Sequence, residues 1–357
     1  MDRALVGISK GMGTKKNKSF LRGCLGCLVS VSAIVLALAL ITFLFLDYHY
    51  NLRSNLVYVE FNRSRSPLEL KVDGQGWKSL TNLDPSLIRQ AAKRKFENEG
   101  YLWQTIRVRR GGHSTREKAV NFAVPSEVHV IEFDPAHYSL HTSFDRKSDG
   151  SFNELTAKQV KSRIAPGSIF AINCNYFDYS KGTASPMGLI VSEGKEIISR
   201  RAGWSGFFFV KNGKPYFGPT SLFESTSGKL TEAAQGYPSV MKDGQIFSYL
   251  NSPGSLNRFF NGKELTFRSL AAVKKDGTVM FVVSGRGGLM NMGEVCSIAK
   301  ALGANHATLL DGGRALQYEF SRGIHRKAFR AFNNTFEHEG RFAPVRPPAY
   351  LVVKPKG

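Results

Sequence analysis

The most uniform apolar stretch of the chain runs from Gly23 to Leu46 and contains no charged residue. At 1.5 Å per helical residue it is long enough to cross about 30 Å of hydrocarbon. A cleavable signal peptide has a shorter apolar region with small residues after it, whereas this stretch ends in the bulky run Phe43–Asp47. We therefore predict an uncleaved transmembrane signal anchor over residues 24–46.

Basic residues precede this segment and few acidic ones oppose them. The positive-inside rule predicts that residues 1–23 form a cytoplasmic tail and that the chain after the anchor lies outside the inner (plasma) membrane, in the periplasm or the extracellular space. No second apolar segment of comparable length follows, which predicts a single-pass protein. The basic residues of the tail that lie nearest the span are Lys15, Lys16, Lys18 and Arg22.

Residues 47–124 mix polar and apolar positions, and we expect a stalk and N-terminal extension here. Residues 56–61 read as a strand, and residues 84–97 as a helix with Asp84 as the cap and Pro85 in the first turn. Residues 106–117 hold a basic cluster. We interpret it as a solvated loop and strand edge in preference to a binding patch.

From residue 125 onward, short apolar runs alternate with turns that contain Gly, Asp or Asn. Dipeptides such as Asn212-Gly213 and Asp243-Gly244 favour tight hairpins. One helix is predicted over Gly293–Leu302, with Gly303 as its C-terminal cap. The pattern predicts an α+β fold over 125–357, a strand-rich mixed sheet domain with few helices, preceded by one transmembrane helix. The predicted strands include 128–133, 168–173, 188–192, 206–210, 270–273, 279–284 and 307–310.

Composition and charge narrow the classes of partner. The 357 residues are 42% hydrophobic and 22% charged, which excludes bulk disorder and fibrous classes, and the net charge of +21 favours anionic partners. No nucleic-acid-binding module accompanies that charge, so no nucleic acid is expected. The histidines show no metal-ligand spacing, so we expect no metal and no cofactor. The four cysteines form no disulfide framework, although a Cys174–Cys296 bridge stays open.

Three polar segments follow predicted strands and could carry chemistry. The first is residues 171–178, which ends a strand and opens a polar loop; the second is Phe267–Ser269; the third is Leu309–Gly313, where Asp311 precedes two glycines. A strand end can hold a carboxylate in place while glycines let a ligand approach the backbone. Taken alone, an Asp-Gly pair is also a common turn signal.

The order of these segments resembles the phosphodiester glycosidase family, the group related to the lysosomal uncovering enzyme, over most of residues 125–355. No single box is specific, but seven occur in the family's order. The matching positions are 173–178, 186–189 with the turn at 193–195, 236–244, Arg268, Gly285-Arg286, Glu294 and 310–313. Three departures from the family pattern occur. Arg314-Ala315 stands where many members carry Gly-Ser or Ser-Ser, Leu309 stands where the usual residue is Asn, and Cys174-Asn175 stands in place of a Gly-rich stretch.

The resemblance implies cleavage of a sugar-1-phosphodiester at the anomeric carbon, with release of the sugar and a phosphomonoester. Such cleavage needs a carboxylate to support oxocarbenium character and a group for proton transfer. Asp311 is the first candidate for the essential carboxylate, with Asp178 or Glu294 as its partner. The candidates for holding the phosphodiester are Arg268, Arg286 and Arg314, those for the sugar hydroxyls are Asn173 and Asn175, and Gly312 and Gly313 would let the substrate approach.

Two hypotheses remain open from the sequence. The first is a membrane-anchored exported hydrolase acting on sugar-1-phosphodiester bonds in glycan, envelope or exopolysaccharide material. The second is a non-catalytic protein of the same fold that binds anionic glycan during polysaccharide assembly, which the Arg314-Ala315 departure favours. The sequence leaves the sugar and the oligomeric state undetermined.

Overall fold

The computed structural model describes residues 14–50, 61, 66–81, 83–98, 100–111, 114–178, 183–250, 262–331 and 345–357. It divides into two compact units, Met1–Tyr50 and Asn51–Gly357, which are described separately. The strand expected at 56–61 lies outside the described residues except for its last position.

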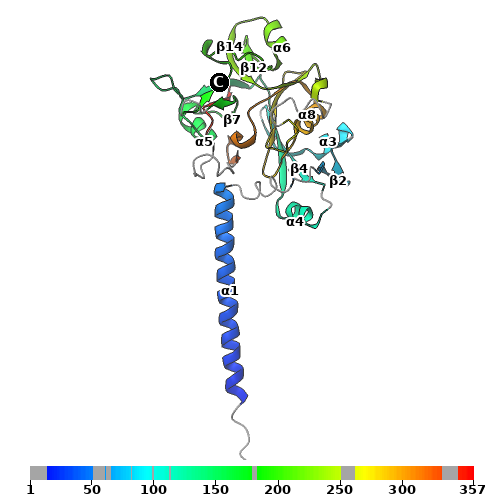
Figure 1. Cartoon of the computed structure of the whole chain (residues 1–357), viewed down its shortest axis with the longest axis vertical. Helices are drawn as coiled ribbons and strands as arrows, with labels where there is room; N and C mark the ends of the chain where they lie inside the picture. The colour runs from blue at the N-terminus through cyan, green and yellow to red at the C-terminus, as the bar shows by residue number, and fades with distance from the viewer. Residues whose placement is uncertain are drawn as a thin grey trace, which may run out of the picture. The chain divides into compact units, whose positions relative to one another are not determined.

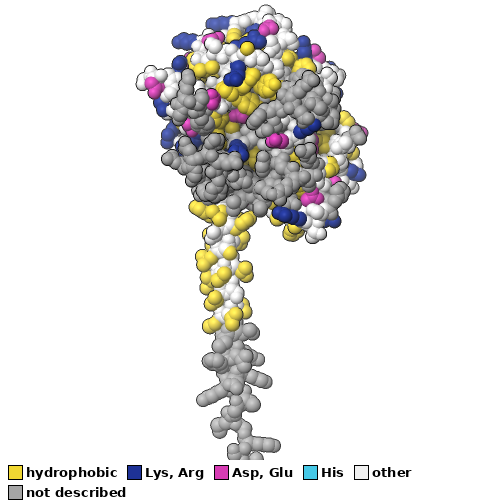
Figure 2. Space-filling model, viewed as in Figure 1, with side chains coloured by type: hydrophobic (Ala, Val, Ile, Leu, Met, Phe, Trp, Pro, Cys, Tyr) yellow, Lys and Arg dark blue, Asp and Glu magenta, His cyan; other side chains and the backbone are white. Residues whose placement is uncertain are grey.

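The first unit is the helix α1 (Thr14–Tyr50) with the residues that precede it (Figure 1). Within α1 the 21 residues Cys27–Asp47 have a mean hydropathy of 2.7. Figure 2 shows hydrophobic side chains along the described part of this helix. The stretch is long and apolar enough to cross a membrane, and its place near the N-terminus also fits a signal sequence.

The second unit is strand-rich and has few helices, as the sequence predicts. Every strand pair described in it is antiparallel, rather than mixed, and tight hairpins join several of the neighbouring strands. The helices of this unit are α3 (Pro85–Ala91), α4 (Thr115–Ala123), α5 (Ala157–Gln159), α6 (Thr220–Ser225) and α8 (Met292–Ala301), with short turns η1 (Val160–Ile164), η2 (Ser248–Leu250) and η3 (Gly313–Ala315).

Three sheets and a short hairpin make up the unit. The ten-stranded sheet has the order β16-β15-β19-β17-β18-β5-β4-β1-β2, with β3 also paired to β4. Its strands are β1 (Leu68–Val72), β2 (Gly76–Ser79), β3 (Lys93–Asn98), β4 (Tyr101–Arg110), β5 (Ser126–Phe133), β15 (Ser239–Lys242), β16 (Gln245–Ile246), β17 (Ser269–Lys274), β18 (Val279–Ser284) and β19 (Ala304–Leu309). The second sheet, of order β11-β10-β14-β12-β13, consists of β10 (Ile190–Ser192), β11 (Lys195–Ile198), β12 (Gly206–Lys211), β13 (Lys214–Pro219) and β14 (Leu230–Gly236). The third, of order β21-β20-β7-β22-β6, consists of β6 (Tyr138–Phe144), β7 (Phe170–Asn173), β20 (Gln317–Arg322), β21 (His325–Arg330) and β22 (Ala349–Pro355), and β8 (Phe177–Asp178) pairs with β9 (Ser185–Pro186).

The hairpin turns follow the local signals in the sequence. Glu193, Asn212 and Asp243 have φ angles of 51°, 50° and 51°, and each is followed by a glycine that also has positive φ. Two successive residues with positive φ are what a type I′ turn requires, which is why Asn-Gly and Asp-Gly mark these corners. The turns join β10 to β11, β12 to β13 and β15 to β16.

Two large hydrophobic cores hold the sheets together. The first fills the space between the three sheets, and its aromatic members include Trp103 on β4, Phe170 on β7 and Phe208 on β12. The second lies on the other face of the ten-stranded sheet, where α3 and α8 cover it with residues such as Ile88 and Val295. This arrangement leaves the ends of β7, β17 and β19 at one meeting point of the sheets.

A buried carboxylate joins the second and third sheets. Glu232 on β14 accepts hydrogen bonds from the backbone N–H and hydroxyl of Thr142 on β6, at 2.9 and 2.6 Å, and from the N–H of Glu193 at 3.3 Å. A ring nitrogen of His141 lies 3.4 Å from the same carboxylate. Burial alone would raise the pKa of Glu232, but these hydrogen bonds outweigh it and hold the pKa below that of an ordinary glutamate.

The extension before residue 125 is structured differently from the sequence prediction. The helix predicted over 84–97 ends as α3 at Ala91, and Lys93–Asn98 instead form β3, paired with β4. The basic cluster at 106–117 begins inside β4, a ten-residue strand that pairs with β5. The boundary expected at 125 thus falls between two neighbouring strands of one sheet.

The cysteine bridge that the sequence left open does not form. Cys174 and Cys296 are both buried and free. They belong to different hydrophobic cores, Cys174 to the core between the sheets and Cys296 to the core under α8. Burial raises the pKa of the Cys296 thiol to about 12, so this thiol stays protonated at neutral pH.

Candidate active site

Asp311 lies where the ends of three strands meet. It follows β19 and the buried residue Leu310, and only 7% of its surface is exposed. Its backbone N–H donates to the carbonyl of Cys174, after β7, at 3.0 Å. The N–H of Leu310 donates to the carbonyl of Ser269, at the start of β17, at 2.9 Å. The backbone therefore fixes Asp311 from both sides.

Asn173, the last residue of β7, braces the same loop. It is fully buried, and its Nδ2 donates to the Asp311 carbonyl at 2.8 Å. Its Oδ1 accepts from the N–H of Gln317 at 2.9 Å. Because both ends of the amide bond to the protein, the geometry gives Asn173 a bracing role. Contact with sugar hydroxyls stays a prediction for this residue.

Asn175, two residues after Asn173, is also buried and held by hydrogen bonds to the protein. Its Nδ2 lies 3.3 Å from the carbonyls of Met187 and Leu189 and 3.2 Å from that of Gln235, and it is 1% exposed. Its Oδ1 accepts from the Cys174 thiol at 2.9 Å. Asn175 thus ties the segment after β7 to the second sheet, and its predicted contact with a sugar is untested.

The two glycines after Asp311 let the loop lie directly on the backbone that enters β17. A Cβ placed on Gly312 would come within 2.6 Å of the Phe267 carbonyl oxygen. Gly313 has a φ of 57°, and its N–H donates to the same carbonyl at 2.7 Å. A side chain at position 312 would push the loop, and Asp311 with it, away from β17.

The environment of the Asp311 carboxyl disfavours its charged form. Burial raises its pKa well above that of an ordinary aspartate, and a hydrogen bond from the Gly312 backbone only partly opposes this. No ion pair of Asp311 with a basic side chain occurs within the described part of the chain. The raised pKa favours the protonated form of this carboxyl, which is the form that a catalytic acid needs.

Arg268 lies beside the Asp311 loop with much of its guanidinium committed to backbone carbonyls. It is 7% exposed; its Nε donates to the Met290 carbonyl at 3.1 Å and its Nη2 to the Glu264 carbonyl at 3.0 Å. Burial lowers the pKa of Arg268, while the nearby Tyr176 and Glu264 act in the opposite direction. An arginine remains protonated even so, which leaves a buried positive charge near the loop.

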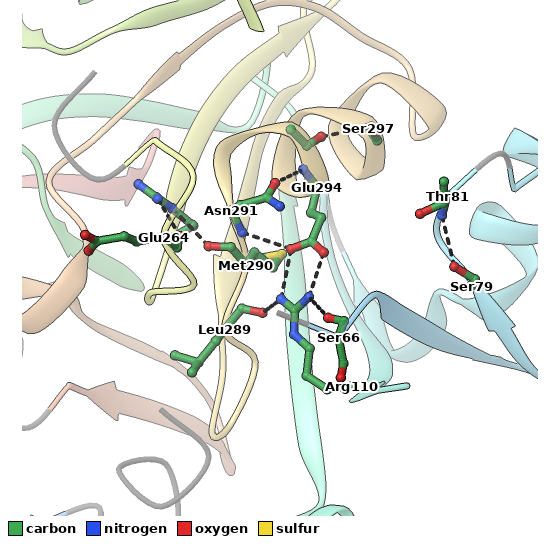
Figure 3. A network of polar contacts seen from close by, with 12 residues as sticks. Ser66, Ser79, Thr81, Arg110, Glu264, Leu289, Met290, Asn291, Glu294 and Ser297 are labelled. Carbon is green, nitrogen blue, oxygen red and sulfur yellow. Dashed lines mark hydrogen bonds and ion pairs between the residues drawn. The ribbon is translucent and has the colours of Figure 1, made fainter. Parts of the chain in front are cut away.

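Glu294 takes part in a buried ion pair at the start of α8. Its two carboxylate oxygens accept from the two terminal nitrogens of Arg110 at 2.7 and 2.8 Å (Figure 3). Glu294 also completes the capping box of α8, in which Asn291 and Glu294 each accept the other's backbone N–H at 2.9 Å. Arg110 in turn donates to the carbonyls of Ser66 and Leu289. These contacts favour a positioning role for Glu294 over direct catalysis.

The remaining predicted site residues lie nearer the surface. Asp178 is exposed on β8, and Arg314 is exposed on η3 directly after the glycine pair. Arg286 is partly buried in the turn after β18, and its carbonyl accepts from the N–H of Glu127 at 3.0 Å. The structure therefore groups Asp311, Asn173 and Arg268 at the meeting point of β7, β17 and β19. Site roles for Asp178, Arg286 and Arg314 stay predictions.

Comparison with known proteins decides the family. The profile of the phosphodiester glycosidase family matches residues 166–339 of the chain, a segment that contains every predicted site residue. Residues 166–339 belong to the phosphodiester glycosidase family. The phosphodiester glycosidase domain thus covers β7 through β21, including the Asp311 loop. No curated protein sequence matches the chain.

One of three similar solved structures supports the fold of this phosphodiester glycosidase domain. The catalytic domain of zebrafish N-acetylglucosamine-1-phosphodiester alpha-N-acetylglucosaminidase, auto-inhibited by its pro-peptide, has a TM-score of 0.50 at 15% identity, over 75% of this chain and 87% of that one. A hypothetical protein from Synechocystis scores 0.43 at 13% identity, over 80% of this chain and 68% of that one. A Burkholderia pseudomallei protein named as exported scores 0.42 at 11% identity, over 81% of this chain and 91% of that one. At these identities the likeness concerns the fold alone.

An aromatic cluster that sequence analysis missed lies beside Asp311 in this domain. The ring centroid of Tyr176 is 5.3 Å from that of Trp204, and Trp204 stacks on Tyr237 at 5.8 Å. The Tyr176 hydroxyl donates to the Tyr237 carbonyl at 2.9 Å. Burial raises the pKa of Tyr176. The segment that carries this ring adjoins the Asp311 loop, because the carbonyl of Cys174 accepts the Asp311 N–H at 3.0 Å. Tyr176 and Tyr237 lie in two of the segments that match the family, 173–178 and 236–244, and this was the sequence signal that could have indicated the cluster.

Proposed function

We propose that this chain is a membrane-anchored exported hydrolase that cleaves sugar-1-phosphodiester bonds in glycan or envelope material. The observation that carries the proposal is Asp311, a buried carboxyl without a cation partner in the described residues, in the Asp-Gly-Gly box of a phosphodiester glycosidase domain. Its surroundings raise its pKa, as a proton donor requires.

In the proposed reaction, Asp311 donates its proton to the phosphate oxygen that leaves the anomeric carbon. The C1–O bond breaks, the phosphomonoester departs with that oxygen, and positive charge develops on the sugar. An ionised carboxylate, with Asp178 as the candidate, supports that charge while water adds to C1. The proton released by the water restores Asp311, so the overall change is addition of one water molecule. The charge of Arg268 near the loop favours the anionic substrate.

The anchor would hold this domain outside the cytoplasm. We propose that α1 is a single membrane span with the Lys- and Arg-bearing tail inside and the residues after Tyr50 in the periplasm or the extracellular space. The tail and span (residues 1–46) carry a net charge of 6 − 1 = +5, and the remainder carries 21 − 5 = +16, which suits an anionic glycan substrate.

A substrate panel tests the hydrolase. Full-length protein in detergent is incubated with methyl phosphodiesters of several sugar-1-phosphates, N-acetylglucosamine among them, and with the matching sugar-1-phosphate monoesters and neutral methyl glycosides. The proposal expects release of free sugar from at least one diester and not from the neutral glycosides. Binding of the diesters without turnover of any would instead support the anionic-glycan binding protein, which the exposed Arg314 beside the site favours.

A further inference from the structure

The loop between β11 and β12 carries a stacked arginine and tryptophan next to the candidate active site. The guanidinium carbon of Arg201 lies 5.1 Å from the centroid of the Trp204 ring. Trp204 meets Tyr176 edge-on and stacks on Tyr237, and all three rings are partly exposed. Tyr176 lies two residues after Cys174, whose carbonyl accepts the N–H of Asp311 at 3.0 Å, so the stack adjoins the Asp311 loop through this ring.

A buried glutamine fixes the backbone of this loop. Gln235 on β14 is fully buried; its Oε1 accepts from the N–H of Arg201 at 2.8 Å and from the N–H of Leu189 at 3.0 Å. Its Nε2 donates to the carbonyls of Arg201 and Trp204 at 3.0 and 2.9 Å. All four hydrogen-bonding positions of the amide are used, and three of them hold the loop. The backbone that presents Arg201 and Trp204 is therefore preorganised.

The Arg201 side chain has no acidic partner within the described residues. It is exposed, and among the described residues its one polar side-chain contact is the hydrogen bond that Nη1 donates to the Met187 sulfur, a weak acceptor, at 3.2 Å. The neighbouring Arg200 differs, because its guanidinium donates to Glu224 at 2.8 Å and lies over Phe207 at 5.2 Å. Of these two adjacent arginines, Arg201 faces the aromatic cluster with its charge uncompensated.

We propose that Arg201, stacked on Trp204, binds the phosphate of the sugar-phosphodiester substrate. The inference rests on the proposed function, since it names the residue that recognises the anion at that site. A guanidinium that lies over an aromatic ring keeps its N–H groups available, and these form the fork that matches two phosphate oxygens. Arg268 commits Nε and Nη2 to backbone carbonyls and is less free to serve this role. The Trp204 indole N–H has no hydrogen-bond partner in the described residues and is available to a substrate hydroxyl.

Calorimetric titration of the full-length protein in detergent tests this inference without requiring turnover. The probes are the methyl diester of N-acetylglucosamine-1-phosphate and, as the neutral counterpart, methyl N-acetylglucosaminide. The variants are Arg201→Ala, Arg201→Lys and the matched control Arg200→Ala. We expect Arg201→Ala to weaken binding of the diester by about tenfold or more, because it removes charge-assisted hydrogen bonds, while binding of the glycoside is unchanged.

The control variants separate recognition from fold. Arg200→Ala should bind the diester as the wild type does, and Arg201→Lys should recover only part of the lost affinity, because an ammonium lacks the fork and the stack. Equal affinity of wild type and Arg201→Ala for the diester overturns the inference, as does a wild type that does not prefer the diester to the glycoside. Arg201-dependent binding without hydrolysis would retain this inference and reject the proposed hydrolase. Hydrolysis with an unchanged KM in Arg201→Ala would retain the proposed hydrolase and reject this inference.

Discussion

The buried Arg110–Glu294 pair yields a prediction whose size follows from the geometry. Arg110 is 3% exposed and Glu294 15% exposed as side chains, and two hydrogen bonds of 2.7 and 2.8 Å join them. Removing one partner of a buried pair leaves an uncompensated charge and costs about 3–5 kcal/mol. We expect Glu294→Gln to lower the free energy of unfolding by about 3 kcal/mol, because glutamine still accepts one hydrogen bond, and Arg110→Met to lower it by about 3–4 kcal/mol.

The double variant reveals whether the two side chains act as a pair. With both charges gone, neither is stranded, so we expect the double variant to lose about 4 kcal/mol rather than the sum of roughly 6–7. The resulting coupling of about 2–3 kcal/mol is measured by urea unfolding of the four proteins, with the full chain in detergent.

The adjacent Arg109–Glu69 pair supplies a matched control on the same strand. Its nitrogen and oxygen are 2.6 Å apart, but the side chains are 38% and 20% exposed. Water screens such a pair, and Arg109→Met should cost less than about 1 kcal/mol. Coupling below about 0.5 kcal/mol for Arg110 and Glu294, or an equal loss for Arg109→Met and Arg110→Met, would refute the reasoning.

The same proteins also separate the two roles considered for Glu294. If Glu294 acts only by positioning α8 and the loop before it, the folded double variant retains measurable hydrolysis of a diester. If Glu294 takes part in the chemistry, the double variant and Glu294→Gln are both inactive while folded. The contacts to Arg110 and to the capping box lead us to expect retained hydrolysis.

Three further predictions follow from particular residues. Because the pKa of Asp311 is raised and its protonated form is the proposed donor, kcat/KM for a diester should fall as pH rises through that pKa. A kcat/KM that instead rises with pH over this range would contradict the role of Asp311 as proton donor. Glu232 has a lowered pKa in the folded state, so its stabilisation is fully present above about pH 4.5 and is lost as pH falls through the folded pKa; the difference in unfolding free energy between wild type and Glu232→Gln, measured by urea, should shrink only below that pH. Gly312→Ala should lower kcat by about tenfold or more, because its Cβ would lie 2.6 Å from the Phe267 carbonyl oxygen and displace the loop, whereas Gly293→Ala, whose Cβ has 3.4 Å to its nearest neighbour, should leave kcat unchanged.

Much of the fold is encoded in local signals that a single sequence shows. Asn212-Gly213 and Asp243-Gly244 predict hairpins because glycine and its neighbour adopt positive φ at little cost, and the structure has hairpins there. The helix predicted over Gly293–Leu302 appears as α8 within a residue at each end. These elements depend on turn chemistry and periodicity, both of which lie within a few residues.

Elements decided by distant partners were harder to predict. The segment 84–97 has helical character, but Lys93–Asn98 form β3 because β4 offers an edge for pairing, and such tertiary pairing overrides local propensity. Arg110 lies in the basic cluster that the sequence analysis interprets as solvated. It is buried because Glu294, far along the chain, accepts hydrogen bonds from both terminal nitrogens of its guanidinium. Nothing near Arg110 in the sequence signals that partner.

The candidate site also combines residues that the sequence alone reveals with residues that only the folded structure reveals. Asp311 and its glycines could be found from a short box after an apolar strand, and the structure explains why the glycines are needed. Arg201 and Trp204 could not, because their significance comes from Gln235 and Tyr176, which adjoin them only in the folded chain. Basic and aromatic residues in a loop are common, and only their shared position beside Asp311 makes them candidates.

The most direct test of the account is the turnover number of the full-length protein on the best diester of the panel, compared with Asp311→Asn. Asp276→Asn, an exposed turn residue after β17, is the matched control. We predict that Asp311→Asn lowers kcat by a factor of about 10² or more, as loss of a catalytic acid does, while its binding of the diester and its unfolding free energy stay close to those of the control. Turnover by Asp311→Asn at the rate of the wild type would contradict the central role of this carboxyl.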